Sequence, residues 1–307
     1  MAQQARAYTA AHFVLELDDA KQVGFIRSVE GGNIKAEVMT YQAGNKHDVW
    51  RQLGRPKIED LKIQVGMSMS KGFFEWLKGF FTGDVARKSG AILAGDFNYE
   101  EKGRRTFYDA LISSIDFPKL DGSDKNTCYM TITLTPERME FDKGKNGKLD
   151  PSVGQLRQKF WTAANFRFNL DGLENACARV LQVDGFSIKQ KVLEYPAGNS
   201  IHAVRVPSFI EWPNISFYVP EVDAQPFIDH FTKHIIKGEV RTGRDNGYLA
   251  YLDHEGTEMA KLEFKGADLI SVTPDKSDSS SDDLKKVKIE ISLESMNFVY
   301  GDAAALE

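Results

Sequence analysis

The segment Tyr41-Gln42-Ala43-Gly44-Asn45 recurs later in the chain as Tyr195-Pro196-Ala197-Gly198-Asn199. The two copies lie 154 positions apart in a chain of 307 residues. One shared pentapeptide would be weak evidence, but the flanking sequence matches at nearly the same offset. Because self-similarity at a fixed spacing is the signature of repeated structural units, we interpret the chain as a tandem duplication.

Collinear matches extend through most of each half. They pair Phe13–Asp18 with Phe166–Asp171, Val23–Phe25 with Val183–Phe186, Leu61–Ile63 with Ile215–Phe217, Thr82-Gly83 with Lys237-Gly238, Met130–Leu134 with Val287–Ile291, and Phe141 with Phe298. The last pair is 157 positions apart, so few residues have been inserted. Residues 142–156 are polar and turn-rich, and we expect a linker there with little reason to pack. The predicted domains are residues 1–141, with an N-terminal arm, and residues 157–307.

Composition limits the classes of function. An apolar fraction of 42% with 20 Phe can build two cores, whereas a formal charge of -5 argues against a broad nucleic-acid-binding surface. Cys128 and Cys177 stand alone, without the short spacing of metal sites or redox pairs, which fits synthesis in a reducing cytoplasm. Residues 1–11 lack a signal-peptide pattern and no segment is apolar enough for a span, so we expect no membrane insertion.

Each copy is predicted to be mainly β, a barrel or sandwich with one flanking α-helix. Alternating apolar and polar residues indicate strands at 12–17, 61–65, 91–99 and 106–115, and in the second copy at 248–252 and 259–272. Apolar residues at helical spacing indicate the helix, which we expect to seal one face of the barrel. They are Phe73, Phe74, Leu77, Phe80 and Phe81 before Gly83, and Phe227, Ile228, Phe231, Ile235 and Ile236 before Gly238.

The sequence contains no recognisable catalytic motif. It has no nucleophile elbow, no phosphate-binding glycine loop before a helix and no Cys-His arrangement, so we predict neither an enzyme nor a cofactor. His230 and His234 are spaced i, i+4, as metal ligands can be, but no third ligand is evident. We predict no metal site and interpret the pair as a partly exposed helix face. A two-domain binding module is the alternative of another class.

The order of features resembles the tail tube proteins of contractile phage tails and bacterial contractile injection systems. The features are an opening strand, a Val-Gly-Phe segment, the Tyr-x-x-Gly-Asn segment, a basic stretch, paired strands and an aromatic helix. In the first copy they are Phe13–Asp18, Val23–Phe25, Tyr41–Asn45, Arg51–Pro56, Leu61–Val65 with Gly66, and Phe74–Trp76. The second copy keeps Val183–Phe186 and Tyr195–Asn199 but has Pro220 in place of Gly66, as a diverged member would.

The resemblance implies a barrel-like domain, six of which form a ring, with rings stacked into a hollow tube for DNA or effector protein. It implies synthesis in the bacterial cytoplasm, self-assembly, and contacts with neighbouring tube rings, sheath, and baseplate hub or spike proteins. Residues 41–56 would be the ring-stacking loop. The assembly-interface candidates are Tyr41, Gly44, Asn45, Arg51, Arg55, Tyr195, Gly198 and Asn199.

The duplication changes how many chains a ring needs. If six domains close a ring, three chains suffice. Such a pseudo-sixfold trimer also suits a tube-initiating or baseplate hub adaptor between a sixfold tube and a threefold spike. Six chains in two stacked rings, or a whole tube of fused subunits, are equally compatible with the sequence.

Overall fold

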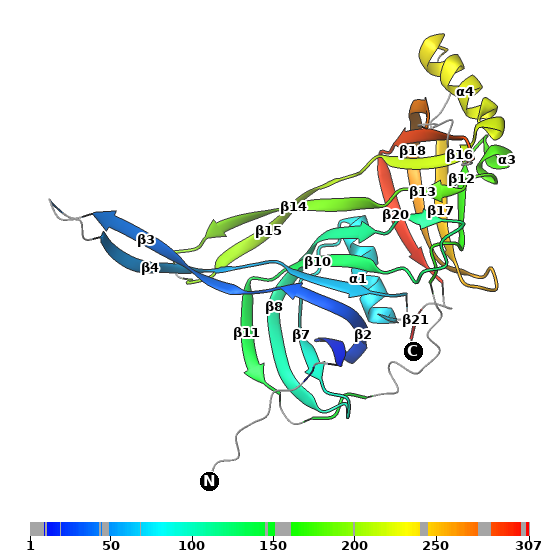
Figure 1. Cartoon of the computed structure of the whole chain (residues 1–307). Coiled ribbons are helices and arrows are strands. Elements are labelled where there is room, and N and C mark those ends of the chain that lie inside the picture. Colours follow the sequence, from blue (N-terminus) through cyan, green and yellow to red (C-terminus); the bar gives the residue numbers. More distant parts are fainter. Residues whose placement is uncertain are drawn as a thin grey trace.

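The computed structural model describes residues 9, 11–18, 20–42, 44, 49–67, 69–144, 147–150, 161–198, 200–239, 245–275, 284–301 and 305–306. The chain is mainly β and forms two barrel-like halves, as the sequence predicts (Figure 1). No helix in the described ranges has the length and apolar character to cross a membrane.

The first half contains strands β1–β11 and the longer helix α1. Its elements are β1 (His12–Leu17), β2 (Ala20–Gly31), β3 (Ile34–Gln42), β4 (Val49–Ile58), β5 (Leu61–Val65), β6 (Met69–Ser70), α1 (Lys71–Thr82), β7 (Lys88–Gly95), β8 (Glu101–Phe117), β9 (Leu120–Asp121), β10 (Met130–Thr135) and β11 (Arg138–Lys143).

The second half repeats this order with insertions. Its elements are β12 (Phe166–Leu170), α3 (Glu174–Cys177), β13 (Gln182–Val183), β14 (Phe186–Pro196), β15 (Ala203–Glu211), β16 (Ile215–Pro220), the 3-10 turn η1 (Glu221–Asp223), α4 (Gln225–Phe231), the π turn η2 (Thr232–Ile236), β17 (Asp245–Leu252), β18 (Glu258–Pro274), β19 (Lys286–Ser292), β20 (Ser295–Tyr300) and β21 (Ala305–Leu306).

The first barrel is closed and the second is nearly closed. Strands run in the order β10-β5-β2-β1-β7-β8, and β8 also pairs with β10, which completes the circle. The second sheet runs β12-β17-β18-β19-β16-β13-β9. Apolar and polar residues alternate along the strands, so the apolar side chains face the inside of the barrel. In β5 the side chains of Leu61, Ile63 and Val65 are buried while Lys62 is exposed. One continuous apolar core takes side chains from both halves.

Equivalent strands pair in equivalent registers, but one predicted match is wrong. Val183 pairs with Phe217 as Val29 pairs with Ile63, so residues 183–185 correspond to residues 29–31. The sequence match had placed them opposite Val23–Phe25. The cause is local: the first part of β2 pairs with β1, whereas the second copy has the short helix α3 at this place.

Both predicted helices form. α1 is capped by the hydroxyl of Ser70, which accepts from the backbone N–H of Phe73, and it ends at Gly83 with φ of 76°. That left-handed conformation favours glycine, and Gly238 repeats it with φ of 67°. The two glycines lie 155 positions apart although Phe73 and Phe227 lie 154 apart, because the π turn η2 inserts one residue.

Part of the predicted linker packs against the first barrel. Leu149 is buried with Val14, Ala91 and Leu93 in a small second cluster. The polar composition of residues 142–156 concealed this one apolar anchor. Residues 145–146 and 151–156 lie outside the described residues, and the domain limits stay predictions.

Candidate assembly interface

The hairpin β3–β4 is largely exposed and extends away from the first barrel (Figure 1). Every residue of β3 is exposed. The prediction of a loop at 41–56 is wrong in its geometry, because residues 41–42 belong to strand β3 and residues 49–56 to strand β4. Tyr41 pairs with Trp50 across the hairpin, and their rings stack with centroids 6.3 Å apart.

The hairpin β14–β15 of the second half is the counterpart of β3–β4. Tyr195 pairs with Val204 as Tyr41 pairs with Trp50, at the same offset of 154. Both ladders also shift register at the same place, after Ala36 and after Gln190. The two hairpins are therefore the same element in two different environments.

The second hairpin is joined to the first barrel by a sheet edge. One edge of β14 pairs with β15, and the other pairs antiparallel with the end of β8. The paired residues are Phe186 with Phe117, Ser187 with Asp116, Ile188 with Ile115, and Lys189 with Ser114. The side chains of Ile188 and Ile115 are fully buried. The second copy thus adds a strand to the barrel of the first, which satisfies backbone groups on both edges.

A buried arginine holds this second hairpin against the first half. Arg205 on β15 donates from Nη1 to the carbonyl of Pro136 at 2.7 Å and from Nη2 to the carbonyl of Ile58 at 2.9 Å. Its backbone N–H donates to the carboxylate of Glu137 at 2.9 Å, and Glu194 pairs with Nη2 at 2.6 Å. Only 6% of the Arg205 side chain is exposed, so these partners replace water around the charge.

The helix of the first half packs on a strand of the second half. Phe74 stacks on Phe298 and Tyr300 of β20, with ring centroids 6.2 Å and 5.2 Å apart. Phe81 contacts Phe298 at 5.9 Å. The β14–β8 ladder, the Arg205 hydrogen bonds and these α1–β20 contacts are together called the internal junction.

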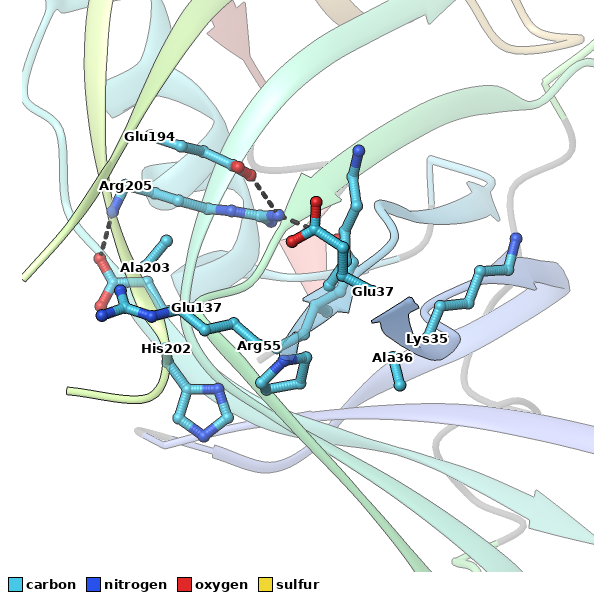
Figure 2. Close-up of a pocket in the computed structure, with 12 residues that line it drawn as sticks. Lys35, Ala36, Glu37, Arg55, Glu137, Glu194, His202, Ala203 and Arg205 are labelled. Carbon is cyan, nitrogen blue, oxygen red and sulfur yellow. Dashed lines mark hydrogen bonds and ion pairs between the residues drawn. The ribbon is translucent and has the colours of Figure 1, made fainter. Parts of the chain in front are cut away.

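An open cavity of about 530 Å³ lies between the base of the β3–β4 hairpin and the part of the β14–β15 hairpin near its tip (Figure 2). Its charged lining residues come from both halves: Lys35, Glu37, Arg55, Lys57 and Glu137 from the first, and Glu194 and Arg205 from the second. Figure 2 shows Glu194 at the guanidinium of Arg205 and Glu137 at the backbone N–H of the same residue. The cavity is therefore a recess of the internal junction.

The structure places the predicted interface candidates along the two hairpins. Tyr41, Arg51 and Arg55 are exposed on the first, Tyr195 is exposed on the second, and Gly44 and Gly198 lie near the tips. Gly44 has φ of 77°, as a tight turn demands. Asn45 and Asn199 lie outside the described residues. Sequence reasoning missed Arg205, although it follows Arg51 by the repeat offset of 154.

The histidine pair and the two cysteines, which were considered as metal-binding or reactive residues, do not form a chemical site among the described residues. His230 lies 3.3 Å from the carboxylate of Asp245, and no group of three or more potential metal ligands occurs among the described residues. Both cysteines are buried and free. Burial raises the pKa of Cys128 to about 11 and that of Cys177 to about 12, so both thiols stay protonated at neutral pH.

In comparisons with known proteins, one family model matches each half of the chain separately. The family model described as T4-like virus tail tube protein gp19 matches residues 9–140 and again residues 162–297. No curated protein matches the chain.

Two solved structures are similar to the chain at low sequence identity. A chain from the PVC extracellular contractile injection system sheath–tube complex is 18% identical with a TM-score of 0.40, covering 46% of this chain and 94% of its own length. A chain from the tube-terminating cap of the anti-feeding prophage is 20% identical with a TM-score of 0.40, covering 47% and 95%.

Proposed function

The chain belongs to the T4-like virus tail tube protein family, and from that premise we propose that it is a structural subunit of the inner tube of a contractile tail or injection system. In this proposal it has no catalytic activity. It forms rings that stack into a hollow conduit for DNA or protein cargo, inside a sheath and above a baseplate.

The observation that carries the proposal is the internal junction between two copies of one family domain. The second copy adds its hairpin to the edge of β8, and α1 of the first copy packs on β20 of the second. A junction of this kind joins unlike surfaces of neighbouring units, so its repetition generates a ring when the rotation closes. Two of the six positions of such a ring would be filled by one chain, and three chains would complete it.

A role as a tube-initiating or hub adaptor ring is the second candidate. It is favoured by the divergence of the two copies: α3 has no counterpart among the described residues of the first half, and α1 spans 12 residues where α4 spans 7 before its π turn. Three chains would therefore give a ring that is sixfold in its barrels but threefold in its surface detail. Such a surface fits a threefold partner on one side and a sixfold tube on the other.

Electron microscopy of the purified protein, with particle mass measured in parallel, tests the proposal. Closed rings of three times the chain mass of 34.5 kDa, or hollow filaments built from them, are the expected result. Rings without filaments would favour the adaptor, and long filaments would favour the main tube. Monomers at every concentration would overturn both.

A further inference from the structure

The strand edges that pair in the internal junction have equivalents elsewhere on the chain, and these equivalent edges are unpaired among the described strands. β14 pairs on both edges, whereas β3, its equivalent, pairs only with β4 among the described strands. The end of β8 has a strand on each side, whereas the equivalent end of β18, residues 271–274, has only β19 beside it in the described part of the chain. Among the described strands, the molecule thus has one free β14-type edge, on β3, and one free β8-type edge, at the end of β18.

The apolar side chain at the free β3 edge is exposed where its equivalent is buried. Ile188 and Ile115 face each other across the internal ladder and are 0% exposed. Ile34, which precedes Ile188 by 154 positions, is 44% exposed. Val272 is the equivalent of Ile115, because it pairs with Ile289 as Ile115 pairs with Ile132. The exposed apolar surface at Ile34 is therefore the surface that the internal ladder buries.

The two helices show the same contrast. Phe74 of α1 is 0% exposed against Phe298, but its equivalent on α4, Ile228, is 38% exposed. On the partner strand, Phe298 is 0% exposed, while its equivalent on β11, Phe141, is 50% exposed. Ile236 at the end of the second helix is 69% exposed. Each open surface thus has its complement on the same molecule.

These open surfaces lie on opposite sides of the chain. β3, β4 and β11 are on the left of Figure 1, whereas β18 and α4 are on the right. The internal junction joins a hairpin and a β20-type strand of one copy to a β8-type edge and a helix of the other. One molecule therefore presents a hairpin and a β20-type strand (β3–β4 and β11) on one side. Another molecule presents the β8-type edge and the helix that pair with them (β18 and α4) on the opposite side.

We propose that a second copy of this chain closes the free surfaces by repeating the internal junction, a proposal that rests on the ring-forming function above. The β3–β4 hairpin of one chain adds to the end of β18 of the next, with Ile34 opposite Val272. Neighbouring pairs are Asn33 with Thr273 and Lys35 with Ser271. Pro274 ends this ladder because it has no amide hydrogen to donate. Ile228 and Ile236 of the second chain pack near Phe141 of the first.

Arg51 has a defined place in this contact. It is the equivalent of Arg205, so in the neighbouring chain it meets the carbonyls of Trp212 and Leu293, which correspond to those of Ile58 and Pro136. Arg51 is exposed in the single chain. Desolvation of its guanidinium would then accompany assembly, and those two carbonyls would replace its water.

The base of the free hairpin is already ordered for pairing. Asn33 donates from Nδ2 to the carboxylate of Glu59 at 2.9 Å, and Lys35 forms an ion pair with the same carboxylate. The hydrogen bond from Lys35 holds the pKa of Glu59 below its usual value. Both contacts join the start of β3 to Glu59 before a partner arrives, which reduces the conformational freedom that these side chains lose on association.

Disulfide trapping tests the register of this contact. Residues directly opposite in an antiparallel ladder have Cα atoms about 4.5–5.5 Å apart, within the range of a disulfide. The double variant Asn33→Cys with Thr273→Cys should therefore give covalently linked chains on oxidation. The matched control, Asn33→Cys with Ser271→Cys, shifts one cysteine by two residues on the same face and should link about tenfold less. The buried native thiols contribute little background.

A surface charge variant gives an independent measurement. Ile228→Asp introduces a carboxylate at a position exposed in the single chain, so the chain should fold normally. It should weaken association by on the order of tenfold or more, because assembly would bury the charge.

The outcomes separate the two proposals. Specific Asn33–Thr273 linkage, with weakened association of Ile228→Asp, supports the repeated junction. Rings that form without this linkage, or that link equally in the control, would overturn the register and leave the ring function standing. Absence of any assembly in the unmodified protein would overturn the ring function and the junction with it.

Discussion

At the scale of single residues, the repeat places one side chain in two environments. Arg205 and Arg51 occupy equivalent positions on the two hairpins, yet the first is buried by partners from the other half and the second is exposed. The same residue type at equivalent positions therefore binds buried carbonyls at one site and is exposed to solvent at the other.

Replacement of Arg205 by Ala should destabilise the isolated chain by about 2–3 kcal/mol, because the buried carbonyls of Ile58 and Pro136 lose their donors. Arg51→Ala is the matched control and should change the free energy of unfolding by less than about 0.5 kcal/mol. Urea denaturation at a concentration where the protein is monomeric measures both. Equal effects of the two variants would contradict the assignment.

Single residues also show where sequence reasoning stopped. The offset of 154 between Arg51 and Arg205 was available from the sequence, but exposure was not, because the carbonyls that bury Arg205 come from segments 69 and 147 positions away. The match of Val183 with Val23 failed because short apolar patterns recur, and only strand pairing identifies Val29 as the equivalent residue.

At the scale of elements, α1 belongs to both halves. Its amphipathic spacing and the stop at Gly83 were readable from the sequence, so the helix was predicted correctly, whereas its Ser70 cap was found in the structure. Its partner was not readable. The expectation that the aromatic stripe only seals its own barrel is incomplete, because Phe74 and Phe81 contact β20 of the second half.

Truncation of this shared face should be costly. Phe74→Ala is expected to lower the free energy of unfolding by about 3–4 kcal/mol, because it leaves a cavity between stacked rings. Ile228→Ala, at the equivalent position on α4, should cost less than about 1 kcal/mol in the monomer because Ile228 is partly exposed. Denaturant titration monitored by tryptophan fluorescence compares them. A small effect at Phe74 would show that α1 does not depend on the second half.

The hairpin arm was harder to predict than the helix. A strand is read from alternation between a buried and an exposed face, but β3 is exposed on both faces, so this signal is missing. The repeat located the element, while its strand geometry became clear only in the structure.

At the scale of the whole molecule, the two halves share one core. Apolar side chains of both copies belong to a single continuous cluster, and β9 of the first half pairs with β13 in the sheet of the second. The duplication and its mainly β character were evident in the sequence. The shared core was not evident in the sequence, because two domains with separate cores and two domains with a common core give the same repeat pattern.

A shared core predicts cooperative unfolding. Scanning calorimetry of the monomeric chain should show one transition, with the calorimetric enthalpy equal to the van't Hoff enthalpy. Two independent domains would instead give two transitions, or a calorimetric enthalpy well above the van't Hoff value. Phe74→Ala should shift the single transition to lower temperature without splitting it.

The covalent link between the copies also bears on stoichiometry and order of assembly. A tethered contact forms at an effective concentration set by the tether, so the internal junction is present at any dilution, while contacts between chains depend on the amount of protein made. Synthesis of one polypeptide delivers the two diverged copies in a ratio of one to one. In a ring built by the proposed contacts they alternate without exception, and no balance between two separate gene products is required.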